Sequence, residues 1–171
     1  MKTEPTIEAV FAPLIGQLVW AVEGGFGTFI TLEFGSPHLR IEEPITASRS
    51  ASDRVRRNLA RRRVFPTGDW HLWIQSGEWS VTTVNGSTSS DEETDNWWKE
   101  RLDDVSGQRL LSVESAEPGR LALRFDLGGL VEVGPGDIER DNDVWTLYPW
   151  TGDIVGCRPD GTLVVSERNA E

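Results

Sequence analysis

The sequence predicts an α+β fold dominated by antiparallel β-sheet, with two tandem repeats of one helix and about five strands related by pseudo-twofold symmetry. The first observation is an internal similarity between the two halves of the chain. The second is that apolar residues alternate with polar ones between Gly-rich turns, which is typical of half-buried strands in hairpins. The third is composition, because 37% hydrophobic residues and eight tryptophans in 171 residues supply a substantial core.

The internal similarity has two offsets. Residues 15–44 align without a gap on residues 106–135, an offset of 91, and Gly-Gln and Val-Glu pairs recur at the same places. Further along, Trp70 faces Trp145, an offset of 75, so the first half holds about sixteen extra residues. We therefore divide the chain into repeat 1 and repeat 2, and expect one compact unit of two half-domains. The boundaries are residues 1–88, with an Arg-rich insertion at 45–65, and residues 89–171.

Each repeat is predicted to begin with a short helix. In the first, apolar residues recur at helical spacing over residues 7–14, and Pro13 should end the helix early. In the second, the same spacing recurs over residues 98–105, with Ser90 or Asp91 as N-cap. The strands that follow are predicted at 18–23, 28–34, 39–43 and 70–74, and at 120–125, 130–133, 144–148 and 160–165.

The insertion is strongly basic. Seven arginines between Arg49 and Arg63 stand against Asp53 alone, which gives the segment a charge of +6 and leaves −17 for the rest of a chain whose total is −11. Its apolar spacing and the serines before it predict a short basic helix that lies over the sheet or projects from it, or a loop that orders on contact. It either binds an anionic partner or folds back on the protein's own acidic surface. Candidate binding residues here are Arg54, Arg56, Arg57, Arg61, Arg62 and Arg63.

The stretch GDWHLWIQSGEW, residues 68–79, raises the choice between an aromatic binding site and a tryptophan-rich core. Trp70 and Trp73 have counterparts in the second half, Trp145 and Tyr148, which favours packing because both copies need the same core. Alternation places Trp70 and Leu72 on one face of a strand and His71 and Trp73 on the other. His71 has no matching histidine in the second half and is therefore a candidate site residue.

Other reactive residues give weaker signals. His38 and His71, with a carboxylate from Glu33, Glu42, Glu43 or Asp69, offer a two-His, one-carboxylate metal site, although partly exposed strand or turn histidines are the favoured interpretation. No compact ligand motif, nucleophile elbow or phosphate loop is present, so no metal, cofactor or catalytic residue is assigned. Cys157 is read as a small buried hydrophobe. Trp97, which has no counterpart, is a candidate interaction anchor.

Charge and cysteine content limit the classes of partner. A net charge of −11 argues against binding to nucleic acid or to an anionic membrane, because both would repel the chain. No segment has the apolar length of a membrane span or signal peptide. A single cysteine fits a reducing compartment, so a cytoplasmic location is expected.

The leading functional expectation is a non-catalytic binding or interaction protein of bacterial type with a basic protein partner. A small, acidic, Trp-rich β protein with a duplicated unit is similar in general character to the immunity proteins that neutralise bacterial toxins, although no motif assigns it to a family. The alternative is a β protein that binds a small anionic ligand or carbohydrate in an aromatic cleft between the repeats, with an arginine of the insertion holding the anionic group. A second alternative is a metal-assisted hydrolase that uses His38 and His71. A homodimer is left open.

Overall fold

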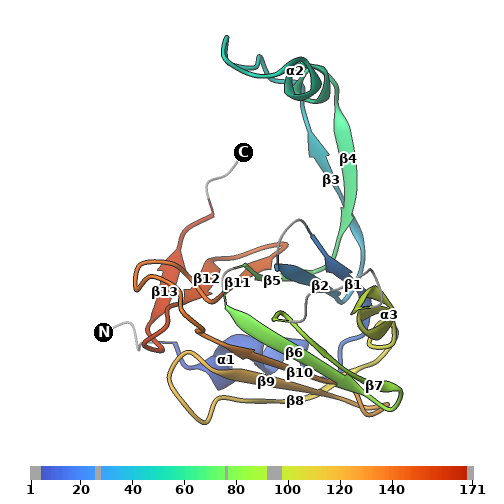
Figure 1. The fold of residues 1–171 in the computed structure, drawn as a ribbon, viewed down its shortest axis with the longest axis vertical. Helices are drawn as coiled ribbons and strands as arrows, with labels where there is room; N and C mark the ends of the chain where they lie inside the picture. The colour runs from blue at the N-terminus through green and yellow to red at the C-terminus, as the bar shows by residue number, and fades with distance from the viewer. Residues whose placement is uncertain (1–4, 26–27, 76, 92–97, 169–171) are drawn as a thin grey trace.

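Two antiparallel sheets facing one another form the body of the computed structural model (Figure 1), which describes residues 5–25, 28–75, 77–91 and 98–168. The six-stranded sheet has the order β1 (Val19–Gly24), β2 (Ile30–Phe34), β5 (Trp70–Ile74), β11 (Trp145–Pro149), β12 (Ile154–Cys157) and β13 (Leu163–Ser166). The five-stranded sheet has the order β7 (Gly86–Ser89), β6 (Glu78–Thr83), β10 (Leu130–Gly134), β9 (Leu121–Phe125) and β8 (Leu110–Glu114). The predicted α+β class dominated by antiparallel sheet is confirmed.

Both sheets combine strands from the two halves of the sequence. The β5·β11 pairing joins the halves in one sheet, and the β6·β10 pairing joins them in the other. The β1·β2 and β8·β9 hairpins also share a register, since Val19 pairs with Phe34 and Leu110 with Phe125, and each first strand has an irregularity directly after that pair. The equivalence of the two halves nevertheless stays a prediction, because the strand order differs between the sheets.

The core lies between the sheets, and the strand alternation explains it. In β2, Ile30, Leu32 and Phe34 are buried and the residues between them face outward. The rings of Phe34 and Phe125 stack at 6.4 Å, which joins the two sheets across the core. The Phe11 ring packs edge-on against Trp145 at 5.2 Å. These large buried side chains form one continuous cluster rather than two separate cores.

The described part of the chain also has three short α-helices, two in the body and one in the arm described below. α1 (Ile7–Phe11) is capped by the Thr6 hydroxyl, which accepts from the Ala9 N–H at 3.2 Å, and a 3₁₀ turn follows at Ala12–Leu14. The early end predicted at Pro13 is confirmed. α3 (Trp98–Asp103) packs on β1. Its predicted N-caps, Ser90 and Asp91, lie instead in the turn after β7, where the Ser90 hydroxyl accepts from the Trp79 N–H at 3.1 Å, so the prediction of Ser90 as cap was wrong. None of the described helices has the length and apolar character needed to cross a membrane.

A long arm, residues 38–67, rises from the body (Figure 1). It consists of β3 (His38–Glu42), α2 (Asp53–Leu59) and β4 (Arg63–Thr67), and β3 and β4 pair only with one another. The predicted basic helix is confirmed, with the Ser52 hydroxyl accepting from the Val55 N–H at 3.4 Å. It projects from the body and does not fold back on the acidic surface.

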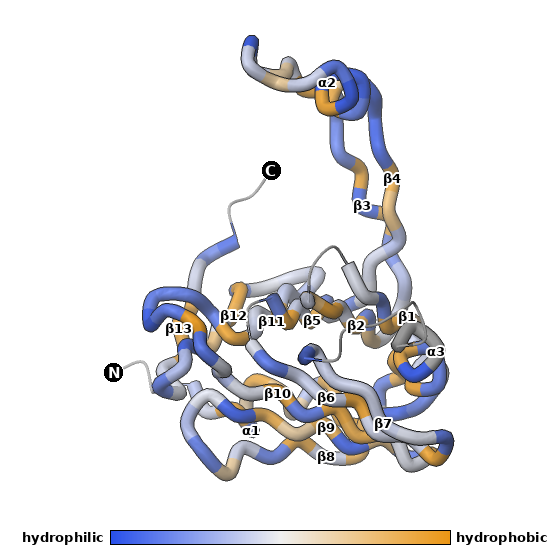
Figure 2. The backbone as a smooth tube through the Cα atoms, in the orientation of Figure 1, coloured by the Kyte–Doolittle hydropathy of each residue, from blue (hydrophilic) through white to orange (hydrophobic). Residues whose placement is uncertain are grey.

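The arm is longer than the insertion predicted from the sequence. The strand expected at residues 39–43 is β3, and it forms the first side of the arm instead of extending the body sheet, because β2 pairs directly with β5. As a result its apolar residues Leu39 and Ile41 are exposed. Figure 2 shows the arm as mostly hydrophilic, with a few hydrophobic positions along its strands.

Candidate functional site

A cleft of about 350 Å³ opens where the arm joins the six-stranded sheet. Its floor is the outward face of β2, β5 and β11, and its sides come from the base of the arm and the segment after β11. The lining residues are Phe29, Thr31, Arg40, Thr67, Gly68, His71, Trp73, Tyr148, Pro149, Trp150 and Arg168. The cleft therefore collects residues that are up to 139 positions apart in the sequence, from Phe29 to Arg168.

Strand register builds the floor. Because side chains alternate along a strand, Leu72 enters the core while His71 and Trp73 face outward, as the alternation predicted. His71 is the cross-strand partner of Glu33 in β2 and of Tyr148 in β11. A slip of one residue in either pairing would put these polar groups in the core, so the burial of the opposite face fixes the site.

Aromatic rings form most of the apolar wall. The Phe29 ring packs edge-on against Trp73, with their ring centroids 6.0 Å apart. The ring centroid of Tyr148 lies 6.4 Å from that of Trp73 and 5.8 Å from that of His71. Partial burial raises the pKa of the Tyr148 phenol, which therefore stays protonated at neutral pH. The packing interpretation of residues 68–79 thus holds for Trp79, which is 5% exposed, and was wrong for Trp73.

Glu33 fixes the position of His71. Its carboxylate accepts from the Gly68 N–H at 2.7 Å, from the Thr67 hydroxyl at 3.3 Å and from Nδ1 of His71. The imidazole is therefore held by one nitrogen, and its other nitrogen, Nε2, can accept or donate a hydrogen bond according to protonation. An oriented imidazole of this kind can bind an anionic or hydroxylated ligand, or move a proton.

A second histidine–carboxylate pair supports the rim. Nε2 of His38 lies 2.6 Å from Oδ1 of Asp69, and the His38 ring stacks on Trp150 at 4.4 Å and 3°. The hydrogen bond with His38 and the one from the Ser36 N–H lower the pKa of the Asp69 carboxyl. Because Trp150 itself lines the cleft, this pair sets the position of an aromatic wall.

Two arginines give the cleft its positive charge. Arg40 comes from β3 of the arm, where its guanidinium lies 5.3 Å from the Phe65 ring centroid and 3.2 Å from Glu42. Arg168 comes from the C-terminal segment, lies 6.0 Å from the Trp150 ring centroid and donates to the Trp150 carbonyl at 2.8 Å. Both guanidinium groups are exposed enough to meet a ligand at the cleft's mouth.

Of the residues selected from the sequence, the structure places only His71 in this cleft. Arg54, Arg56, Arg57, Arg61, Arg62 and Arg63 belong to the arm beyond it, and Trp97 falls outside the described residues. The sequence did not single out Arg40, Trp150 or Arg168. The alternation of β3 and the resulting exposure of Arg40 could have suggested the first, but the others reach the cleft only through the tertiary fold.

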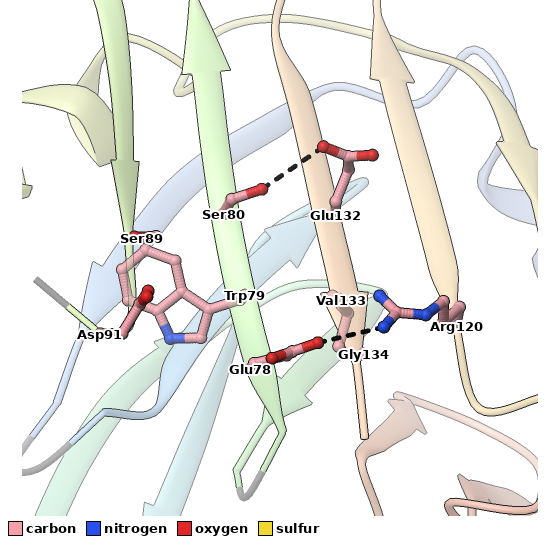
Figure 3. Close-up of a pocket in the computed structure, with 9 residues that line it drawn as sticks. All are labelled: Glu78, Trp79, Ser80, Ser89, Asp91, Arg120, Glu132, Val133 and Gly134. Carbon is pink, nitrogen blue, oxygen red and sulfur yellow. Dashed lines mark hydrogen bonds and ion pairs between the residues drawn. The ribbon is translucent and has the colours of Figure 1, made fainter. Parts of the chain in front are cut away.

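A second hollow, of about 220 Å³, lies over β6, β7 and β10 (Figure 3). Its polar groups are largely satisfied by one another, since Glu78 pairs with Arg120 at 3.3 Å and the Ser80 hydroxyl bonds to Glu132 at 3.4 Å. Trp79 is the one aromatic residue in the described lining. The cleft at the base of the arm is larger and more aromatic, and a histidine and two arginines converge on it. It is therefore the better candidate for a ligand-binding site.

Reactive groups elsewhere are poorly placed for chemistry. Cys157 is buried, and burial raises the pKa of its thiol to about 11, so it is a protonated core residue at neutral pH. The described part of the chain contains no group of three His, Cys, Asp or Glu residues arranged to hold a metal ion. His38 and His71 are instead each engaged by a separate carboxylate.

Comparison with protein-family models, with curated proteins and with solved structures finds no match to this chain.

Proposed function

We propose that the protein is a non-catalytic binding protein whose cleft takes a small anionic ligand with a flat or apolar part. The observation that carries the proposal is the convergence of aromatic rings and two arginines around one oriented histidine. The alternative expectation from the sequence was an aromatic cleft between the repeats with an arginine of the insertion, 45–65, and the arginines that line this cleft, Arg40 and Arg168, both lie outside that insertion. The arginine that the structure favours is Arg40.

Each wall of the cleft suits one part of such a ligand. Trp73, Tyr148 and Trp150 offer ring faces and edges to an apolar group, and burial of aromatic surface gives affinity without directional demands. Guanidinium groups of Arg40 and Arg168 suit a carboxylate or phosphate, which they can bind through two parallel hydrogen bonds. The volume lies at the small end of the roughly 300–1,000 Å³ common for ligand sites.

Binding without catalysis is favoured by what the cleft offers a substrate. Its described lining has no serine or cysteine, and the Thr67 hydroxyl is already donated to Glu33. Nucleophilic catalysis needs an activated nucleophile beside the base. The other hydroxyls of the lining belong to Thr31 and Tyr148, and among the described residues the recorded hydrogen bond of His71 goes to Glu33 and to neither of them. The leading expectation from the sequence, a basic protein partner bound as an immunity protein binds a toxin, rests on size, acidity, tryptophan content and the duplicated unit, and on no motif.

A ligand titration tests the proposal. The probes are phenyl phosphate and indole-3-acetate, with benzyl alcohol and indole-3-acetamide as neutral counterparts, and the readouts are tryptophan fluorescence and calorimetry. We expect saturable binding of the anionic probes at micromolar to millimolar concentration and much weaker binding of the neutral ones. Equal binding of charged and neutral probes, or no binding of any, would contradict the proposal.

A pair of variants locates the binding. Arg40→Ala should weaken the affinity for phenyl phosphate about tenfold or more, since a hydrogen bond to a charged group contributes roughly 1.5–3 kcal/mol and 1.4 kcal/mol is tenfold. Arg124→Ala is the matched control, because Arg124 is half exposed on β9 and pairs with Glu114 away from the cleft. Equal losses in both variants would point to non-specific charge attraction.

We also infer that the two halves are copies of one ancestral unit related by a pseudo-twofold axis. Shared registers and irregularities of the β1·β2 and β8·β9 hairpins support this. So do reciprocal hydrogen bonds between the halves: the Gly16 N–H donates to the Leu110 carbonyl and the Gly107 N–H donates to the Val19 carbonyl, both at 2.7 Å. An offset of 91 converts one of these bonds into the other.

Two pairings have the form expected on such an axis. Leu72 pairs with Leu147, its own counterpart at offset 75, and Leu18 bridges to Arg109, its counterpart at offset 91. We expect a crystal structure in which residues 16–34 superpose on 107–125 by a rotation close to 180°. A bulge in only one of the two hairpins would contradict the duplication.

A further inference from the structure

The arm separates the charges of the molecule. Residues 38–67 contain eight arginines and three acidic residues, Glu42, Glu43 and Asp53, which gives the arm a charge of +5. Because the net charge of the whole chain is −11, the rest of the chain carries −16. The five residues of β3 alone extend about 16 Å at roughly 3.3 Å per residue. Attraction between the arm's end and its own body is therefore screened by salt, whose Debye length is about 8 Å at physiological ionic strength.

The arm's cations are only partly neutralised within the arm. Arg62 pairs with Glu43 at 2.9 Å, and Arg63 and Arg40 share Glu42. No ion pair is recorded within the described part of the chain for the other arm arginines, which are Arg49, Arg54, Arg56, Arg57 and Arg61. A cluster of this kind repels itself and is stabilised by a neighbouring surface of opposite charge.

The stem of the arm also presents an apolar face. Leu39 pairs with Pro66 and Ile41 with Val64, so these four side chains lie on one side of the two-stranded ribbon. Leu39, Ile41 and Val64 are 67%, 55% and 52% exposed. An isolated two-stranded ribbon is marginally stable in water, and both of its edges are open to pairing. A nucleic-acid backbone of charged phosphates offers no apolar surface to cover these residues. The apolar face of the stem therefore favours a protein partner over a nucleic acid.

We propose that the partner of the arm is a second copy of this chain, with each arm lying against the acidic body of the other molecule. The chain itself supplies a surface of the required charge, and the projection of the arm prevents that surface from being used within one molecule. Reciprocal exchange of two arms is a closed twofold arrangement in which every contact occurs twice. Doubling the contacts helps a slender arm to reach the roughly 1,200–2,000 Å² buried in stable interfaces.

The proposal is tested by the mass of the full chain in solution. Sedimentation equilibrium at 1–100 µM should give twice the 19.1 kDa of the chain, with the dimer dissociation constant rising about tenfold between 50 and 300 mM NaCl. A wild-type chain that stays monomeric at 100 µM in 50 mM NaCl would overturn the proposal. So would a dimer whose dissociation constant does not depend on salt.

Variants separate the arm from general charge effects. Arg54→Glu with Arg57→Glu on α2 should weaken dimerisation tenfold or more, and Leu39→Thr with Ile41→Thr should weaken it through the stem. Arg124→Glu with Arg140→Glu makes the same charge change on the body and should leave a dimer at least as strong. Circular dichroism checks that each variant is folded. A dimer that survives both arm variants is held by another surface and overturns the proposal.

A DNA-binding measurement tests nucleic acid as the competing partner of the arm. Fluorescence anisotropy of a labelled 20-base-pair DNA is measured with the wild type and with the Arg54→Glu, Arg57→Glu variant. We expect no arm-dependent binding at 150 mM NaCl. Binding that the variant abolishes, from a wild-type chain that is monomeric, would assign the arm to nucleic acid and overturn the proposal.

Discussion

Glu33 accepts hydrogen bonds from three groups that lie in different parts of the cleft: the base of the arm, the turn before β5 and the imidazole of His71. Its side chain is only 12% exposed. Removing its charge would leave these donors without a hydrogen-bond partner at a largely buried site, where an unsatisfied polar group destabilises the fold. The geometry of the cleft's floor therefore depends on this carboxylate.

Replacing Glu33 by Gln is expected to lower the free energy of unfolding by about 1–3 kcal/mol, because the new amide turns a donor toward groups that already donate. Urea denaturation measures the loss. Glu132→Gln is the matched control, since Glu132 is exposed and its contact with Ser80 is 3.4 Å long; its effect should stay within about 0.5 kcal/mol. Equal effects at both positions would mean that the hydrogen bonds of Glu33 contribute little.

Asp69 predicts a pH dependence of stability. Its folded-state pKa lies below the ordinary value, chiefly because of the hydrogen bond with His38. A depressed carboxyl pKa stabilises the fold fully above the unfolded-state pKa of about 3.9 and stops doing so as pH falls through the folded-state value. The stability difference between the wild type and Asp69→Asn should therefore be largest above about pH 5 and shrink below about pH 4.

Urea denaturation at several pH values between 3 and 7 measures that difference. Asp137→Asn serves as control, because Asp137 is exposed and no ion pair is recorded for it in the described residues. A stability gap that is constant over the whole pH range would contradict the role given to Asp69.

Residue-level prediction from the sequence succeeded where a signal was local. His71 was selected because its counterpart in the second half, Thr146, is not a histidine, and alternation placed it correctly on the outward face. Trp73 was misassigned because a matched aromatic pair was taken as core, whereas Trp73 and Tyr148 both line the cleft. Trp150 and Arg168 could not be found from the sequence, since contacts distant in the sequence bring them to the site.

At the scale of elements, the arm is the part of the chain that contributes least to the core. Among its described residues, only Thr67 is buried, and β3 and β4 make their main contacts with one another. His38 and Thr67 are cross-strand partners at its base, so a two-residue turn placed there can close the chain.

Replacing residues 39–66 by Asn-Gly should leave the free energy of unfolding within about 1 kcal/mol of the wild type, because no buried apolar side chain is removed. The same variant should bind phenyl phosphate at least tenfold more weakly, since it lacks Arg40. Urea denaturation and calorimetry measure the two effects. A variant that does not fold would show that the arm is part of the cooperative unit.

The elements themselves were predictable to different degrees. Alternation and turn residues indicated the body strands, and the Ser52 cap indicated the basic helix. The direction of β3 was not predictable, since its pattern suits a body strand equally well. It leaves the sheet because β5 takes its place beside β2, and that is a competition between strands distant in the sequence.

For the whole molecule, the α+β class was predicted correctly, but the net charge did not reveal how charge is distributed over the structure. The net charge of −11 averages a basic arm and an acidic body that the fold holds apart (Figure 1). Statements about partners drawn from the average therefore describe neither part. The shared sheets explain how the two halves of the chain form one continuous core instead of two small ones.

A titration of ¹⁵N-labelled protein with phenyl phosphate, followed through the tryptophan indole N–H signals, tests directly whether the cleft binds an anionic ligand. We expect the signals of Trp73 and Trp150 to shift with one common dissociation constant and that of the core residue Trp145 to stay unchanged. Shifts confined to tryptophans outside the cleft, or no shift at millimolar phenyl phosphate, would contradict this expectation.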